Sequence, residues 1–201
     1  MGLFLNPDDV QLRDDRCNPF YIDKSLIISE LNKLLETDDN NVCVSRPRRF
    51  GKTMAANMIA AYYTKGVDSH DAFKGLKIES DSSFEENINK YNVLKLDAIS
   101  FYYGRIKGQS SMEKLISLVI PEFREQFTDL VFPDTCNIAQ AIRTVYEEKK
   151  EQFVIIIDEY DVMVRENDRE EMEPYLNFLN GLFKNSNLAP AIALSYVTGI
   201  L

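Results

Sequence analysis

The chain has 201 residues, of which 45% are hydrophobic and 27% charged, a composition typical of a globular domain with a substantial core. The formal net charge of -9 and the pI near 4.8 argue against a general nucleic-acid or membrane-surface binder, because such proteins carry a basic surface. The longest apolar runs, such as 153–157, are too short to span a bilayer, so we expect no membrane partner.

The three cysteines, Cys17, Cys43 and Cys136, are odd in number and widely spaced. This pattern argues against a disulfide framework, and the paired spacing of a zinc site does not occur. We therefore expect reduced core thiols and a cytoplasmic protein.

Hydrophobic spacing divides the chain into an irregular N-terminal segment, 1–22, and one domain, 23–201. Helices are expected over 23–36, 53–66, 111–127, 137–150 and 173–185, and strands over 42–45, 91–99, 153–161 and 191–201. This alternation predicts an α/β fold with a mainly parallel sheet flanked by helices. Pro121 is expected to kink or stop its helix, and Pro174 to lie in the first turn of its helix.

Residues 41–66 predict a strand, a tight loop and a helix, with Gly-Lys-Thr at the junction, as in a phosphate-binding loop (P-loop). In such a loop, backbone N–H groups at the start of a helix point at a phosphate. Gly51 lets the backbone approach, Lys52 provides a charge for the β- and γ-phosphates, and Thr53 can ligate Mg²⁺. The residues expected to contact the nucleotide are Pro47, Arg48, Arg49, Phe50, Gly51, Lys52, Thr53 and Met54.

The loop departs from the usual Gly-x-x-x-x-Gly-Lys-Thr pattern, because Arg46 occupies the position of the first glycine. Pro47 holds Arg46 in an extended conformation, so the first bend must be built differently. Arg48 and Arg49 add positive charge whose partner is phosphate, another domain or solvent.

A second segment, FVIIIDEYD (153–161), supplies acidic residues at the end of an apolar run. Five consecutive apolar residues fit a parallel strand buried on both faces. Asp158 is expected to hold Mg²⁺ together with Thr53, and Glu159 to polarise the attacking water. The alternative is that these carboxylates simply end a strand at the solvent boundary. ATP is favoured over GTP, because the glycine and the Asn-Lys-x-Asp guanine reader of GTPases do not occur.

Four segments together resemble the bacterial predicted AAA-ATPase-like family. They are FYIDKS (20–25), RPRRFGKT (46–53), FVIIIDEYD (153–161) and VTGIL (197–201), and they follow the order of that family. The resemblance implies a P-loop NTPase of the ASCE/AAA-like type, with the last strand between the P-loop strand and the Asp158 strand. It also implies that Arg46 belongs to an intact loop variant and that Thr198 senses the γ-phosphate. The expected catalytic residues are therefore Lys52, Glu159 and Thr198.

The FYIDKS segment allows two interpretations. Tyr21 and Lys24 line the adenine side of the nucleotide, or Asp23 opens a helix as its N-cap with Tyr21 packed beneath it. The second interpretation is favoured, because it needs no ligand.

In the family that the chain resembles, a helical lid and often a PD-(D/E)xK nuclease-like domain follow the P-loop module. This sequence stops at Leu201, before the lid, so we expect contact with nucleic acid only through a domain absent here. Without the lid, hydrolysis is expected to be slow or absent. A P-loop strand at the edge of the sheet would favour a homo-oligomer or another protein partner.

Two functions fit these residues best. The first is an ATP-binding, Mg²⁺-dependent P-loop NTPase that hydrolyses ATP as a switch or motor, with ATP and Mg²⁺ as its cofactors. The second is a nucleotide-binding or pseudo-ATPase interaction scaffold without turnover. A small-molecule kinase ranks lower, because Asp158 and Glu159 together indicate water as the acceptor.

Overall fold

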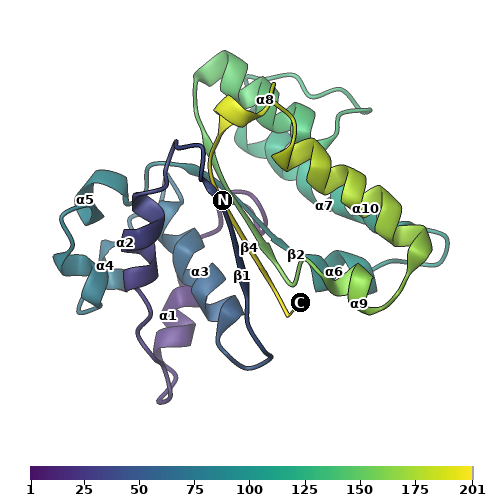
Figure 1. Cartoon of the computed structure of the whole chain (residues 1–201). Coiled ribbons are helices and arrows are strands. Elements are labelled where there is room, and N and C mark those ends of the chain that lie inside the picture. The colour runs from purple at the N-terminus through teal and green to yellow at the C-terminus, as the bar shows by residue number, and fades with distance from the viewer. Residues whose placement is uncertain (201) are drawn as a thin grey trace.

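The computed structural model describes residues 1–200 and has three layers, with one sheet between two groups of helices (Figure 1). The strands are β1 (Asn41–Ser45), β2 (Asn92–Asp97), β3 (Phe153–Asp158) and β4 (Ile192–Gly199). They pair in the order β1-β4-β3-β2, and each pairing is parallel. The predicted α/β class is confirmed, and so is the position of the last strand between the P-loop strand and the Asp158 strand.

The helices divide between the two faces of the sheet. One face is covered by α1 (Val10–Arg16), α2 (Leu26–Asn32), α3 (Lys52–Tyr63), α4 (His70–Phe73), η1 (Lys77–Ser80) and α5 (Phe84–Asn87). The other is covered by α6 (Ala98–Tyr103), α7 (Ser111–Gln126), α8 (Ile138–Lys149), α9 (Val162–Arg165), α10 (Arg169–Phe183) and η2 (Ala189–Ala191). Every helix within residues 1–200 is too short or too polar to cross a bilayer.

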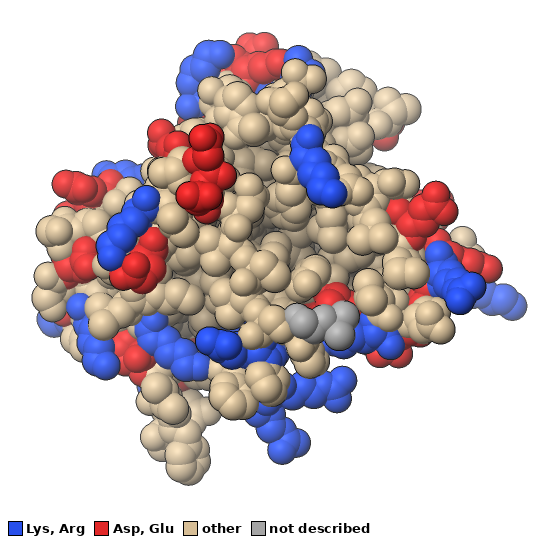
Figure 2. Space-filling view, in the orientation of Figure 1, with Lys and Arg blue, Asp and Glu red and all other residues tan. Residues whose placement is uncertain are grey.

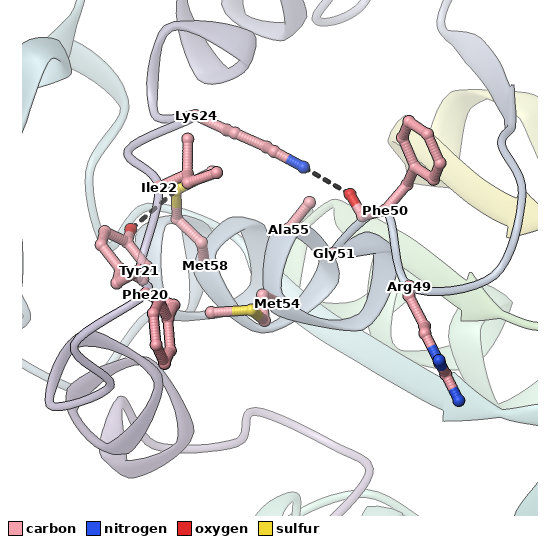
Figure 3. Close-up of a pocket in the computed structure, with 10 residues that line it drawn as sticks. All are labelled: Phe20, Tyr21, Ile22, Lys24, Arg49, Phe50, Gly51, Met54, Ala55 and Met58. Atoms are coloured by element: carbon pink, nitrogen blue, oxygen red, sulfur yellow. Dashed lines mark hydrogen bonds between the residues drawn. The ribbon is translucent and has the colours of Figure 1, made fainter.

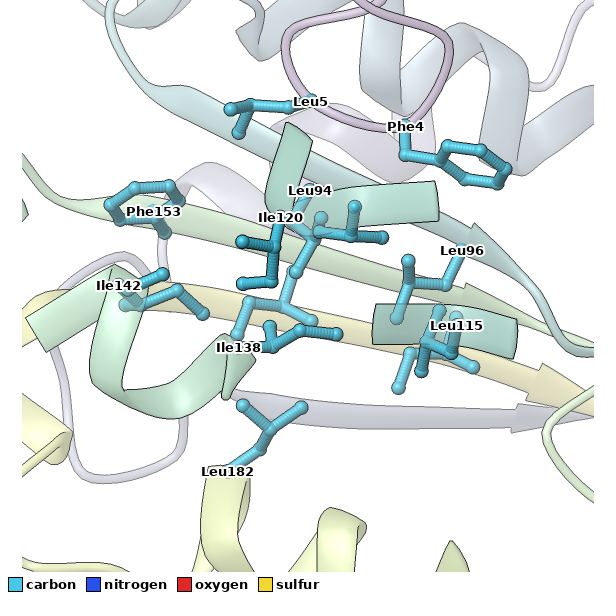
Figure 4. Close-up of a cluster of buried hydrophobic side chains, with 14 of the residues drawn as sticks. Phe4, Leu5, Leu94, Leu96, Leu115, Ile120, Ile138, Ile142, Phe153 and Leu182 are labelled. Carbon is cyan, nitrogen blue, oxygen red and sulfur yellow. The ribbon is translucent and has the colours of Figure 1, made fainter. Parts of the chain in front are cut away.

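The central strand β3 is buried along its whole length and contributes to two separate cores. Because side chains alternate along a strand, Phe153, Ile155 and Ile157 face α7, α8 and α10, whereas Val154 and Ile156 face α3. Figure 4 shows the first core, in which side chains of these three helices meet β2 and β3. Burial on both faces fixes β3 in place, and with it the position of the acidic residues at its end.

The N-terminal segment is more regular than expected. Residues 10–16 form α1, whose Leu12 is fully buried, and Leu5 forms an antiparallel bridge with Leu94 of β2. The expectation of an irregular segment over 1–22 is therefore wrong for these parts. The apolar pattern in this segment is short, but tertiary contacts stabilise its structure. Residues near Leu5 cover the outer edge of β2.

Pro121 does not stop its helix, and Pro174 does not lie in the first turn of its helix. Pro121 lies within α7 without ending it, and Pro174 lies at the sixth position of α10, because the Asp168 side chain caps that helix earlier in the chain. A proline inside a helix removes one hydrogen bond to the carbonyl four residues before it. Here those carbonyls belong to Ser117 and Glu170, which are exposed, so water can satisfy them.

Strand β1 lies at the edge of the sheet, with β4 as its neighbour on one side. Its side chains are exposed or half-buried, and Cys43 is exposed on it. Cys17, at the end of α1, is also exposed, whereas Cys136 is buried. The expectation of core thiols is thus wrong for Cys17 and Cys43, because both lie at borders of the fold rather than between layers.

Glu122 of α7 fastens the N-terminal segment. Its carboxylate accepts hydrogen bonds from the backbone N–H groups of Leu3, Phe4 and Leu5, at 2.7–2.9 Å. We predict that Glu122→Ala lowers the free energy of unfolding by about 2 kcal/mol, because three donors lose a charged acceptor. Urea denaturation measures this change. The exposed Glu125→Ala, in the same helix, is the control; equal unfolding free energies for the two variants would contradict the role of Glu122.

Candidate functional site

The loop between β1 and α3 emerges at the carboxyl end of the sheet. Residues 46–50 are exposed, and the chain turns sharply through positive φ angles at Arg49 (68°) and Gly51 (73°). The Arg46 N–H donates to the Gly199 carbonyl at 3.2 Å, so pairing with β4 continues one residue past β1. Lysine and arginine side chains gather along the lower edge of the molecule, where this loop lies (Figure 2). The predicted strand–loop–helix arrangement is present, without a glycine at position 46.

Lys52 is the first residue of α3, and its ammonium group is buried beneath the loop. Nζ donates to the carbonyl oxygens of Arg46 at 3.0 Å and Pro47 at 3.3 Å. It also lies 3.6 Å from Oε1 of Glu159. The ammonium group of Lys52 therefore lies at the centre of the loop, between the backbone carbonyls and the carboxylate of Glu159. Phosphate oxygens could replace these partners.

Thr53 and Asp158 are in direct contact, although they are 105 residues apart in the sequence. The hydroxyl of Thr53 donates to Oδ2 of Asp158 at 2.6 Å. Thr53 is exposed, whereas Asp158 is buried, so the pair lies where the solvent boundary meets the end of β3. This contact brings together the two side chains for which the sequence predicts a shared metal.

Thr198 of β4 contacts the same carboxylate from the other side. Its hydroxyl is fully buried and donates to Oδ1 of Asp158, which also accepts the Glu159 N–H at 3.1 Å. Because Thr198 is directed at Asp158, its evident contribution is to orient that carboxylate. Its role toward the γ-phosphate stays a prediction.

Glu159 is held between two cations. Its backbone has a positive φ of 54°, unusual for a residue with a side chain, and its Oε2 lies 2.5 Å from Nη1 of Arg165, while Oε1 faces Lys52. Burial alone would lower the pKa of Arg165, but the hydrogen bond to Glu159 and the charge of Asp161 raise it. Nε of Arg165 is buried and has no partner within residues 1–200.

Asp161 and Gly199 lock the acidic turn against the end of β4. Asp161 is buried, accepts from the Ile200 N–H at 3.0 Å and contacts Arg165 at 3.2 Å. A Cβ at position 199 would lie 2.7 Å from the Tyr160 ring and 2.8 Å from Asp161, so glycine is required there. The turn that carries Glu159 is thereby fixed relative to the strand next to the P-loop.

The charge of Asp158 acts on the titratable groups around it. Burial lowers the pKa of Lys95, and the charge of Asp158 opposes that shift. Desolvation raises the pKa of Asp97, with a further contribution from Asp158, its partner in the β2–β3 register. Burial and the same charge raise the pKa of Tyr196 to about 12. Negative charge is therefore concentrated at the carboxyl ends of β2 and β3, which favours a cation at this place.

A hollow of about 310 Å³ opens between the loop and the acidic turn. The residues that line it are Arg48, Arg49, Gly51, Lys52, Thr53, Met54, Ile99, Glu159 and Arg165. Most of the residues expected to contact a nucleotide thus share one cavity. Pro47 contributes through its carbonyl, and Phe50 lines a neighbouring pocket on the other side of the loop (Figure 3).

The FYIDKS segment combines features of both interpretations. Helix α2 begins at Leu26, and Asp23 accepts from the Ser25 N–H at 2.8 Å, so it fixes the turn before the helix rather than forming the N-cap itself. Tyr21 and Lys24 line the neighbouring pocket, and Nζ of Lys24 donates to the Phe50 carbonyl. This segment therefore contacts the P-loop directly.

The Thr53–Asp158 pair has the chemistry that Mg²⁺ prefers. A hydroxyl and a carboxylate are hard oxygen ligands, and Mg²⁺ is commonly held by one or two such groups together with water and substrate phosphates. Within residues 1–200, no group of three or more His, Cys, Asp or Glu side chains is arranged to hold a metal alone. The residues present fit a metal that arrives with a phosphate ligand.

A model of a known protein family matches this sequence and identifies the family of the chain. The model described as predicted AAA-ATPase matches residues 10–201, nearly the whole chain. The chain belongs to the AAA-ATPase-like family. Membership indicates a nucleotide-binding ATPase module, consistent with the P-loop geometry. No curated protein and no solved structure matches the chain.

In this AAA-ATPase-like chain, the sequence did not point to Arg165 or Gly199 as parts of the site. Arg165 lies six residues after Glu159 on α9, and its only signal is that spacing after an acidic turn. Gly199 belongs to the VTGIL segment, where a glycine near the end of a buried strand indicates a close approach of another side chain. The Gly199 contact depends on how the turn after β3 packs against β4, and the Arg165 contact depends on the path of the chain from that turn into α9.

We predict that Thr198→Val lowers the free energy of unfolding by about 1 to 3 kcal/mol, because it removes a donor from the buried, charged Asp158. Thr64→Val is the matched control. It also removes a fully buried hydroxyl, but one that donates to the Ala60 carbonyl, which keeps the Thr64 N–H as a second donor. Urea denaturation of both variants tests the difference; equal losses would show that the hydroxyl of Thr198 has no special relation to Asp158.

Proposed function

We propose that this AAA-ATPase-like chain is a Mg²⁺-dependent module that binds ATP on the β1–α3 loop and hydrolyses it as a switch or motor. The observation that carries the proposal is the 2.6 Å contact between Thr53 and Asp158. It joins the end of the P-loop to the acidic end of β3, next to a buried lysine. An isolated Gly-Lys-Thr triplet would not have this partner.

In this proposal, each polar group acts on a different part of the triphosphate. Lys52 exchanges its backbone acceptors for phosphate oxygens, and Gly51 lets the backbone approach them. Thr53 and Asp158 hold Mg²⁺, which when bound neutralises the charge that develops on the phosphates. Glu159 orients and polarises the attacking water, and Arg165 fixes its carboxylate.

The choice of ATP rests on what the sequence lacks. A guanine-specific site would need a reader of the Asn-Lys-x-Asp type, and the chain has no such segment. Membership in a family described as predicted AAA-ATPase supports the same choice.

The ion pair of Glu159 favours a second candidate, a nucleotide-binding scaffold without turnover. The carboxylate is held by Arg165 and faces Lys52, so it must leave at least one cation before it can act on water. If that exchange does not occur when ATP binds, the module holds nucleotide and does not hydrolyse it. Binding and turnover therefore need separate tests.

We predict that Mg-ATP at about one hundred times its Kd stabilises the wild-type chain by roughly 2.7 kcal/mol and that Lys52→Ala abolishes this gain. The variant loses the cation at the centre of the loop. Thermal denaturation with and without Mg-ATP measures the effect. The exposed Lys107→Ala keeps the full stabilisation as the control, and a melting temperature that does not respond to millimolar Mg-ATP in the wild type would contradict the proposal.

We predict that Glu159→Gln retains ATP binding but lowers phosphate release by about 10² to 10⁴-fold, because the amide cannot accept a proton from water. Single-turnover phosphate release measures this step, with the exposed Glu148→Gln as the control. Equal release by wild type and Glu159→Gln would remove Glu159 from the mechanism. Binding without release in the wild type would support the scaffold instead.

A further inference from the structure

The sheet has two edges, and the N-terminal segment covers only one of them. Outside β2, the Asn6 N–H donates to the Val93 carbonyl at 2.7 Å. The Lys95 N–H donates to the Phe4 carbonyl at 2.8 Å. At the opposite edge, β1 pairs with β4 alone among the described residues. In Figure 1, β1 lies between the two groups of helices, and the middle of the same view in Figure 2 shows few charged side chains. The outer edge of β1 is therefore open to another chain.

Every second residue of β1 presents its backbone to this open edge. In a parallel pair, the N–H and C=O groups of successive residues point to opposite sides of the strand. The Asn40 carbonyl accepts from the Ser195 N–H of β4 at 2.8 Å, so the even-numbered residues face β4. The outward N–H and C=O groups are those of Asn41, Cys43 and Ser45, all of which are exposed. A row of unpaired backbone groups is a template for a further strand.

The sequence of β1 lacks the features that commonly keep an edge strand from pairing with another chain. Such features include lysine, proline and a bulge. Residues 41–45 read Asn-Val-Cys-Val-Ser, without a charge or a proline, and their register with β4 is continuous. The pattern is nearly symmetric about Cys43, with a valine on each side and a small polar residue at each end. A strand with this symmetry can pair with an antiparallel copy of itself.

Opposite charges flank this strand in the sequence. Asp38 and Asp39 precede it, Arg46, Arg48 and Arg49 follow it, and all five are exposed. An antiparallel copy brings the acidic end of one chain next to the basic end of the other, at both ends of the paired strands. A parallel copy would place like charges together, which is destabilising. Charge therefore selects the antiparallel arrangement.

We propose that the open edge of β1 pairs antiparallel with β1 of a second copy of this chain. Cys43 then lies on the two-fold axis, opposite Cys43 of the second copy, and an Asn41–Ser45 pair lies on each side of it. Each of the three pairs exchanges two hydrogen bonds, and the two four-stranded sheets become one continuous sheet. Asp38 of the second copy comes next to Arg48, which lines the hollow between the P-loop and the acidic turn. The second copy therefore contacts the P-loop itself.

Sedimentation equilibrium over a range of protein concentrations measures the association. We expect the wild type to show a monomer–dimer equilibrium that weakens as salt is raised, because salt screens the charges at the strand ends. Cys43→Lys should weaken dimerisation by about tenfold or more, because it places two ammonium groups opposite each other on the axis. Cys17→Lys, the same substitution at the other exposed cysteine, is the matched control and should leave association within about twofold.

An exchange of charges tests the antiparallel direction. The double variant Asp38→Arg, Asp39→Arg has two basic ends, and the double variant Arg46→Asp, Arg48→Asp has two acidic ends. Each variant alone should dimerise more weakly than the wild type, because like charges meet. A mixture of the two should form dimers again, because each basic end then meets an acidic one.

The native cysteines provide a direct probe of the axis. A bismaleimide should link Cys43 to Cys43 of the second copy, because the two side chains lie side by side on one face of the joined sheet. The covalent dimer should persist in Cys17→Ser and disappear in Cys43→Ser, with Cys136 buried in both.

Circular dichroism melting curves show whether each variant is folded, and all the substituted side chains are exposed. A wild type that stays monomeric at about 100 μM would overturn the proposal and leave the edge to a different partner. Equal association of wild type and Cys43→Lys, or no association in the mixture of the two charge variants, would also overturn it.

Discussion

The buried carboxylate of Asp158 connects three parts of the chain that are distant in sequence. It accepts the hydroxyl of Thr53 at the start of α3, the hydroxyl of Thr198 in β4 and the N–H of Glu159. A buried charge is costly unless it is paired or fully hydrogen-bonded, so this carboxylate constrains the elements that supply its partners. The site exists because β1, β4 and β3 end at the same edge of the sheet.

The two groups of helices give the site two chemically different sides. Residues 20–24 and α3 lie on one face of the sheet and form an apolar pocket, whereas the turn after β3 and α9 place Glu159 and Arg165 on the other side of the loop. Gly51 lies between them and lines both cavities.

Charge balance distinguishes the resting site from a site engaged with ligand. Lys52 is satisfied by backbone carbonyls and Glu159, and Glu159 is satisfied by Arg165. A triphosphate would compete with Glu159 for both cations, and the outcome decides whether the carboxylate becomes free to act on water. The same residues can therefore support hydrolysis or binding alone, depending on the relative strength of these ion pairs.

The sequence by itself determined the α/β class, the central strand order implied by the family resemblance, and the residue types at the loop and the acidic turn. The fold class and the residue types follow from local signals: apolar periodicity, the Gly-Lys-Thr triplet and the carboxylates after a buried run. The strand order follows only from the resemblance. Only the tertiary structure decided that Arg165 pairs with Glu159, that Thr198 is directed at Asp158, and that Leu5 joins β2. The contacts of Thr198 and Leu5 join elements distant in sequence, so they depend on strand register and packing, and the Arg165 contact depends on the path of the chain after β3. Local composition does not encode any of these.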